Sequence, residues 1–305
     1  MEVILARPRG FCAGVNRAIN VVNKALEVYM PPVYVLHEIV HNTHVIRELE
    51  KKGAVFVEQL EDIPCGSIAI FSAHGVSKAV KEQAKNLGLR TINATCPLVS
   101  KVHRRVSLLN KINYDVVVIG HKGHPEVEGT CGHASGSVHV VSSPEEVQSL
   151  QVNNPSRVGY VTQTTLSIDD TAKMLTALRK QFPNISEPSR TDICFATSNR
   201  QVAVRELSES VDLILVVGSK NSSNSNRLRE VAKKNHIPAY LIDHAEEIDR
   251  NWLNNAKRVG ITAGASAPEY LVTGLVSWLR KNYNVKKAQE MEGINETICF
   301  QLPDI

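Results

Sequence analysis

Three cysteines stand at equivalent points along the chain, each after a short apolar run and before a helix-like pattern. They are Cys12, Cys96 and Cys194. A thiol at the N-terminus of a helix is favoured as a thiolate by the backbone dipoles. The other cysteines, Cys65, Cys131 and Cys299, have no such correspondence, and we expect them to be ordinary small apolar residues.

Three thiolates could bind a metal centre if the fold brings them together. Zinc is one candidate, but thiolates gathered from distant helix ends more often hold an iron–sulfur cluster. A fourth position without a cysteine would leave one metal open to a substrate, which favours catalysis. The sequence has no Cys-x-x-Cys pair, and its six cysteines lack the spacing of a disulfide framework.

A second set of polar residues follows other short apolar runs and consists of imidazoles, hydroxyls and one amide. The set is His41, His74, His124, Thr165, Ser222, Ser223, Asn224 and Ser266. Any one of these residues more often caps a helix or satisfies a loop. Together, and with helix N-termini, they would form a ring of donors suited to a phosphate or diphosphate, with little need for Lys or Arg.

One carboxylate, Glu126, stands out as a possible proton donor. It lies in a stretch rich in Gly and His that follows an apolar run, where partial burial would raise its pKa. Thr164 occupies a place from which it could pass the proton on. The alternative is that Glu126 caps the next helix, and the residues alone leave these two interpretations about equal.

The elements that would position these groups occur three times. After each cysteine come a helical pattern and two short apolar strands that run out into polar residues. The expected strands are 33–36 and 68–71, then 116–119 and 158–161, then 213–217 and 259–262. Such runs between amphipathic helices predict an α/β fold with mainly parallel sheets, which bind ligands at the carboxyl ends of their strands.

The repeat predicts three α/β domains, 1–95, 96–192 and 193–280, related by a pseudo-threefold axis around a central cavity. Residues 281–305 fall outside it. Ile298, Phe300 and Leu302 alternate as in a strand, so we expect this tail to pack back on the first domain.

Composition excludes several classes of protein. With 305 residues, 43% hydrophobic, the chain can bury a substantial core, and its net charge is only +4. Its basic residues are scattered, so we expect no nucleic-acid partner. No apolar stretch has membrane-spanning length and no signal peptide is evident, so we expect a cytoplasmic protein without a membrane partner.

Several longer motifs resemble one known family. They are PRGFCAGV (8–15), HEIVHN (37–42), FSAHGV (71–76), ATCPLV (94–99), GHPEVEGT (123–130) and TQTTLS (162–167), with the serine-rich runs ending at Asn224 and Ser266. In these motifs the chain closely resembles the LytB-type 4-hydroxy-3-methylbut-2-enyl diphosphate reductases. The resemblance implies three α/β domains around a cavity and a [4Fe-4S] cluster held by Cys12, Cys96 and Cys194, with the fourth iron open to substrate.

The same resemblance implies roles for the other residues. The ring of eight donors would hold the diphosphate, Glu126 would donate the proton, and Thr164 would orient the substrate hydroxyl and relay the proton. The implied reaction is reductive dehydroxylation to isopentenyl and dimethylallyl diphosphate, the last step of the methylerythritol phosphate route. The open iron would bind the allylic hydroxyl, two electrons would enter through the cluster, and Glu126 would protonate the departing oxygen.

Electrons would come from a ferredoxin- or flavodoxin-type carrier, because the chain has no dinucleotide fingerprint. Closure of one domain over the substrate would exclude water. Two alternatives from other classes remain, a non-redox phosphate-ligand-binding module and a zinc hydrolase. Analysis of iron, zinc and sulfide after anaerobic purification separates the three.

Overall fold

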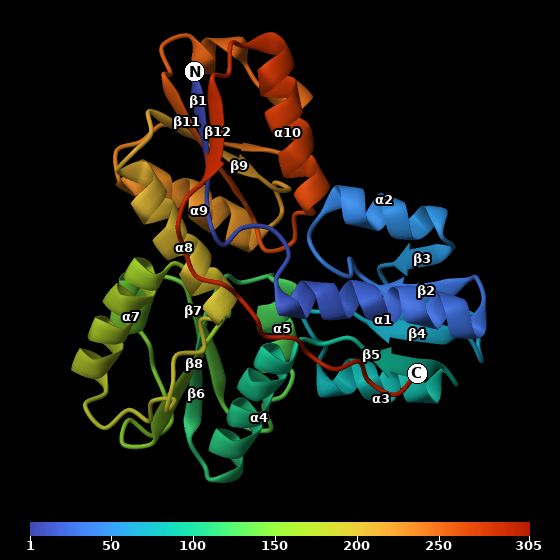
Figure 1. Cartoon of the computed structure of the whole chain (residues 1–305). Helices are drawn as coiled ribbons and strands as arrows, with labels where there is room; N and C mark the ends of the chain where they lie inside the picture. The colour runs from blue at the N-terminus through green and yellow to red at the C-terminus, as the bar shows by residue number, and fades with distance from the viewer. The chain divides into compact units, whose positions relative to one another are not determined.

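A computed structural model describes all 305 residues (Figure 1). It contains three sheets, with strand orders β10-β9-β11-β1-β12, β3-β2-β4-β5 and β7-β6-β8. Neighbouring strands in all three sheets run parallel. The predicted α/β fold with parallel sheets is therefore confirmed. The chain forms two compact units, which are described separately.

The first unit comprises Met1–Val15, His41–Val45 and Phe195–Cys299 and contains the five-stranded sheet. Its strands are β1 (Glu2–Leu5), β9 (Leu213–Val217), β10 (Ala239–Ile242), β11 (Arg258–Ala263) and β12 (Lys287–Glu290). Its helices are α8 (Phe195–Ser208), α9 (Ser223–Lys234), α10 (Glu269–Asn282) and the short 3-10 helices η2 (Ala245–Glu247) and η3 (Arg250–Leu253).

The central strand of this sheet, β9, is buried on both faces because successive side chains point to opposite sides. Leu215 packs into a cluster with Leu275 and Leu279 of α10. Ile214 packs into another cluster with Leu207 of α8 and further residues of α9. Helices therefore cover both faces, which explains why the strand sequence is uniformly apolar.

The second unit comprises Asn16–Val40, Ile46–Cys194 and Phe300–Ile305 and contains two sheets. The four-stranded sheet is made of β2 (Val33–Leu36), β3 (Ala54–Val57), β4 (Ile68–Phe71) and β5 (Arg90–Asn93). The three-stranded sheet is made of β6 (Asp115–Ile119), β7 (Val138–Val141) and β8 (Val158–Thr162). Its helices are α3 (Lys78–Asn86), α4 (Pro97–Lys111), α5 (Pro125–Cys131), α6 (Pro144–Gln148), α7 (Ile168–Gln181) and the 3-10 helix η1 (Leu60–Asp62).

Two further helices, α1 (Ala13–Tyr29) and α2 (Thr43–Lys51), have residues in both units. Local sequence explains where several helices start. Ser77 and Ser167 cap α3 and α7 by accepting hydrogen bonds from the backbone three residues ahead. Pro97 and Pro125 occupy the first position of α4 and α5, where the missing N–H costs nothing.

The N-terminal strand and the tail depart from the simple repeat. β1 lies between β11 and β12. A strand from the predicted first domain, 1–95, therefore joins the sheet that contains the strands of the predicted third domain, 193–280. The tail does form a strand against β1, but at Lys287–Glu290.

The strand expected at Ile298, Phe300 and Leu302 is wrong, because these residues belong to no strand. Ile298 and Leu302 are 48% and 43% exposed. Their alternation has no partner strand to pair with, whereas the polar segment Lys287–Glu290 pairs through its backbone. The domain limits, the pseudo-threefold axis and the central cavity stay predictions.

No helix combines the length and the apolar character that crossing a bilayer requires.

Candidate active site

Each of the three predicted ligand cysteines lies directly before a helix. Cys12 precedes α1, Cys96 is the N-cap residue of α4, and Cys194 precedes α8. None of the chain's cysteines forms a disulfide, and these three are partly exposed. All three thiols therefore lie at the N-terminal ends of helices.

The backbone of each cysteine is held in an equivalent way. The amide of Cys12 donates to the carbonyl of Ala265 at 3.1 Å, that of Cys96 to Ala73 at 3.0 Å, and that of Cys194 to Thr164 at 3.1 Å. Each acceptor comes directly before a predicted substrate-binding residue, namely Ser266, His74 or Thr165. The same local geometry thus occurs three times, linking a cysteine to the segment that follows a buried strand.

The predicted site residues divide between the two units. Cys12, His41, Ser222, Ser223, Asn224 and Ser266 belong to the first, and His74, Cys96, His124, Glu126, Thr164, Thr165 and Cys194 to the second. Within neither unit do three His, Cys, Asp or Glu side chains form a group that could hold a metal ion. The three thiols therefore do not make up a ligand set inside either unit.

Glu126 lies in the first turn of α5 and is 2% exposed. Burial raises the pKa of its carboxyl group to about 7, although two hydrogen bonds from Thr164 work in the opposite direction. The Thr164 amide donates to Oε1 at 2.6 Å and its hydroxyl donates to Oε2 at 3.0 Å. The alternative that Glu126 caps the helix is wrong, because His124 is the cap residue and its Nδ1 accepts from the Glu126 amide at 3.1 Å.

Sequence reasoning missed the importance of Asp192, whose side chain is fully buried. Its Oδ2 accepts a hydrogen bond from the amide of Thr162 at 3.3 Å, and Lys101 Nζ lies 3.7 Å from Oδ1. Burial raises the pKa of Asp192, and its negative charge adds to the rise in the pKa of Glu126. The available signal was an acidic residue two positions before Cys194.

Two of the predicted diphosphate-binding histidines are neighbours. The rings of His74 and His124 lie edge to face with their centres 5.8 Å apart. Because Nδ1 of His124 accepts from a backbone amide, its neutral form carries the proton on Nε2. Such an imidazole presents a donor edge that suits an anionic oxygen.

Gln163 is another residue whose role the sequence did not reveal. It is 2% exposed, its Nε2 donates to Thr165 Oγ1 at 3.0 Å, and its Oε1 accepts from the amide of His121 at 3.1 Å. The side chain thereby ties the loop before α5 to the segment after β8. It fixes the threonine hydroxyl relative to the loop that carries His124.

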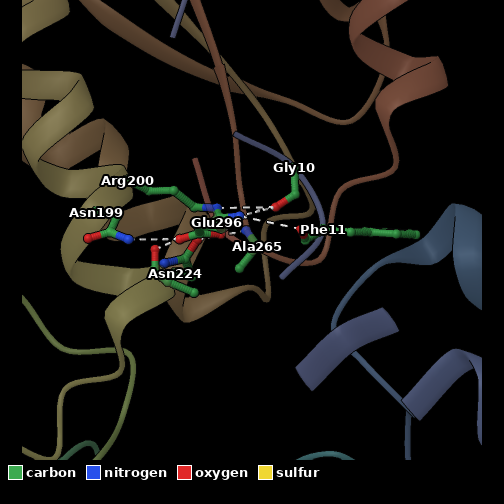
Figure 2. A network of polar contacts seen from close by, with 8 residues as sticks. Gly10, Phe11, Asn199, Arg200, Asn224, Ala265 and Glu296 are labelled. Atoms are coloured by element: carbon green, nitrogen blue, oxygen red, sulfur yellow. Dashed lines mark hydrogen bonds and ion pairs between the residues drawn. The ribbon is translucent and has the colours of Figure 1, made fainter. Parts of the chain in front are cut away.

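In the first unit, the serine-rich run forms the start of α9. Ser222 caps this helix by accepting from the amide of Ser225 at 3.3 Å. Asn224 is 4% exposed, and its Oδ1 accepts from the amide of Ala265 at 2.8 Å (Figure 2). Its Nδ2 is buried without a hydrogen-bond partner. An amide held by its oxygen alone leaves two N–H donors for a ligand.

Ser266 and His41 also lie together in the first unit. The hydroxyl of Ser266 donates to the carbonyl of His41 at 2.9 Å. This hydrogen bond joins the segment after β11 to the segment before α2 and so holds Ser266 next to the backbone of His41.

The fold and these local arrangements define a class of protein. It is an α/β protein with parallel sheets, in which three thiols precede helices and have equivalent backbone hydrogen bonds. A buried glutamate accepts two hydrogen bonds from a threonine. Residues 3–280 match the family described as LytB protein. The chain belongs to this LytB family.

Curated relatives match over nearly the whole chain. The 4-hydroxy-3-methylbut-2-enyl diphosphate reductases of Pseudomonas entomophila (strain L48) and Pseudomonas aeruginosa (strain LESB58) are each 53% identical to it. The matches cover 99% of this chain and 97% and 98% of those proteins, respectively.

A solved structure is also similar over nearly the full length. The E-1-hydroxy-2-methyl-but-2-enyl-4-diphosphate reductase from Plasmodium falciparum matches with a TM-score of 0.96 and 41% identity, covering 99% of this chain and 95% of that one. A second structure, of an (E)-4-hydroxy-3-methyl-but-2-enyl diphosphate reductase described as the terminal enzyme of the non-mevalonate pathway, matches at 35% identity with a TM-score of 0.66. That match covers 92% of this chain and 100% of that one.

Proposed function

We propose that this chain is a 4-hydroxy-3-methylbut-2-enyl diphosphate reductase, which removes the allylic hydroxyl and yields isopentenyl and dimethylallyl diphosphate. The observation that carries the proposal is the double engagement of Thr164. Its amide and hydroxyl hold Glu126, while its carbonyl accepts from the amide of Cys194. A buried acid and a proposed ligand cysteine are thus joined through one residue, which supports a site that delivers protons and electrons to the same substrate.

The donor set fits an iron–sulfur cluster. Cys12, Cys96 and Cys194 form no disulfide, are partly exposed, and each lies directly before a helix, and thiols gathered from such positions are common ligands of these clusters. These three residues would hold a [4Fe-4S] cluster. When bound, the cluster supplies electrons and an iron without a cysteine ligand, which can accept the hydroxyl group of the substrate.

The diphosphate would be bound by the ring of neutral donors: His41, His74, His124, Thr165, Ser222, Ser223, Asn224 and Ser266. Asn224 supports this assignment most directly, since its buried Nδ2 lacks a hydrogen-bond partner. A phosphate oxygen would satisfy it, and the positive end of the α9 dipole favours an anion at the same place.

Glu126 supplies the proton. With a pKa of about 7, its carboxyl group is partly protonated near neutral pH. Protonated Oε2 can donate to Thr164 Oγ1, 3.0 Å away, while the hydroxyl passes its own proton to the departing oxygen of the substrate. Thr164 therefore orients the substrate hydroxyl and relays the proton.

Electrons would be delivered by a ferredoxin- or flavodoxin-type protein, because the chain has no Gly-x-Gly-x-x-Gly fingerprint for a dinucleotide. We also propose a cytoplasmic location. Six cysteines without a disulfide accord with a reducing compartment, where thiolate ligands persist.

Anaerobic purification with iron, zinc and sulfide analysis tests the proposal, followed by a turnover assay with the diphosphate substrate and a reduced carrier. We expect iron and sulfide in equal amounts and both products. Zinc without sulfide would instead identify a zinc hydrolase, and a colourless, metal-free protein would identify a phosphate-ligand-binding module. Single Cys→Ser variants at positions 12, 96 and 194 should lose the cluster, whereas those at 65, 131 and 299 should keep it.

A further inference from the structure

A buried ion pair lies immediately behind the Cys12 segment. Arg200 of α8 is 0% exposed, and its guanidinium lies 3.1 Å from the carboxylate of Glu296 in the C-terminal tail (Figure 2). Asn199 adds a hydrogen bond from Nδ2 to the same carboxylate at 3.0 Å. The tail thus supplies the counter-charge for an arginine that has no access to water.

The same guanidinium holds the backbone before Cys12. Nε and Nη2 of Arg200 donate to the carbonyl of Gly10 at 3.1 and 2.8 Å, and Nη2 also reaches the carbonyl of Phe11 at 3.4 Å. Nη1 donates to the carbonyl of Ala196 within α8. The planar fork of donors fixes these two carbonyls at once, which a lysine could not do.

Before it reaches Arg200, the C-terminal tail lies alongside the N-terminal segment that leads to Cys12. β12 pairs in parallel with β1, and the amide of Met291 donates to the carbonyl of Leu5 at 3.0 Å. Glu290 lies 3.3 Å from Arg7 and 3.2 Å from Arg9, and Asn295 accepts a hydrogen bond from Arg7.

A glycine permits this close approach. A Cβ atom at Gly293 would lie 2.1 Å from the carbonyl oxygen of Arg7, so any side chain there would push the two segments apart. Contacts with the N-terminal segment or with Arg200 therefore recur from Lys287 to Glu296.

We infer that residues 287–296 form a strap that fixes the course of the segment before Cys12, and that the Arg200–Glu296 pair positions this cysteine for its cluster. The inference rests on the proposed function, because it treats Cys12 as a cluster ligand. A buried ion pair contributes little net stability over an apolar pair of the same size. Its role here is geometric. Arg200 fixes the orientation of the Gly10 and Phe11 carbonyls, and therefore the position of Cys12, which follows them.

The reactivity of Cys12 tests the strap without a cluster. The full-length, metal-free protein is treated with iodoacetamide, and alkylation is followed peptide by peptide after trypsin digestion. Cys12, Cys96 and Cys194 fall on separate peptides, which end at Arg17, Lys101 and Arg200. Each thiol is therefore measured in the same sample.

The main variant is Glu296→Gln, which removes the charge while keeping the shape. Loss of a charge-assisted hydrogen bond should raise the alkylation rate of Cys12 about tenfold and leave Cys96 and Cys194 unchanged. Glu292→Gln is the matched control, since Glu292 lies exposed in the same tail and loses the same charge. It should behave like the wild type.

A milder variant covers the case in which Glu296→Gln does not fold. Asn199→Ala removes one hydrogen bond from an uncharged donor to Glu296 and leaves the ion pair intact, so Cys12 should react about threefold faster. An unchanged rate at Cys12 in a folded variant would refute the strap. Equal acceleration at all three cysteines would refute it too, since that reports general loosening.

Cluster retention provides the second measurement. In anaerobically reconstituted protein, Glu296→Gln should release iron to a chelator faster than both the wild type and Glu292→Gln. If the wild type takes up no cluster while the alkylation rates change as expected, the proposed function fails and the strap stands. If the cluster forms and alkylation does not respond, only the strap fails.

Discussion

Thr164 clasps both oxygens of the Glu126 carboxylate, with its amide 2.6 Å from Oε1 and its hydroxyl 3.0 Å from Oε2. These hydrogen bonds stabilise the charged form, whereas complete burial disfavours it. Burial is the larger effect, so the pKa of Glu126 is raised to about 7. Glu126 can therefore bind and release a proton near neutral pH, which is the condition for efficient proton transfer.

Replacing Glu126 by Gln tests its role as the proton donor. The amide has nearly the same shape but no transferable acidic proton, so kcat should fall about a hundredfold or more. Cluster absorbance and substrate binding should be retained. The matched control is Glu128→Gln, an exposed residue in the same helix. Turnover near the wild-type value in Glu126→Gln would contradict the assignment.

The positions of Cys96 and Glu126 at the starts of helices could be predicted from the sequence, because the signals for them are local. A cysteine or an acid that follows a short apolar run and opens a helix is placed by its immediate neighbours, as at Cys96 and Glu126. The α/β class is predicted by the same alternation of short apolar runs and helical patterns.

Residues whose roles depend on distant partners escape such reasoning. The Arg200–Glu296 pair joins positions 96 residues apart, and Gln163 matters through its bonds to His121 and Thr165. The tail strand β12 is polar, so no alternation of apolar residues predicts it. It forms because its backbone pairs with the edge of β1.

The Thr164 hydroxyl can be tested separately from the carboxylate. Thr164→Val removes the hydroxyl but keeps the amide, so the charged form of Glu126 loses one of its two hydrogen bonds and its pKa rises further. Because valine also cannot relay the proton, kcat should fall, and the pH dependence of the remaining kcat should move to higher pH. Thr164→Ser keeps the hydroxyl and should restore the wild-type profile. Identical profiles for Val and Ser would show that the hydroxyl does not act on Glu126.

Stability should also depend on Glu126 as pH changes. Its folded-state pKa of about 7 lies above its ordinary value of 4.5. The contribution to stability is therefore full below pH 4.5 and is lost as pH rises through 7, by about 3 kcal/mol in total. Urea unfolding at about pH 5 and about pH 8 should show this fall in the wild type and in Glu128→Gln. Glu126→Gln should lack it, and an equal fall in that variant would assign the effect to other groups.

The stacked pair His103 and His133 predicts an opposite response in acid. Their rings are 4.1 Å apart, and His103 is 4% exposed with no hydrogen-bond partner for Nε2. The pKa of His103 is lowered to about 3, mainly by burial and also by the charges of His133 and Lys81. The ring packs closely against Gly75, since a Cβ atom at that position would lie only 2.6 Å from it.

Because the folded-state pKa of His103 lies below its ordinary value of 6.5, its contribution to stability is present above pH 6.5 and is lost as pH falls toward 3. Between about pH 7 and about pH 4 this loss amounts to about 3 kcal/mol. His103→Phe keeps an aromatic ring in the stack but cannot bind a proton, so it should unfold less readily in acid. His236→Asn is the control, because His236 is exposed and its positive φ of 60° suits asparagine. Denaturant unfolding across this pH range measures both variants, and wild-type acid sensitivity in His103→Phe would locate the proton uptake elsewhere.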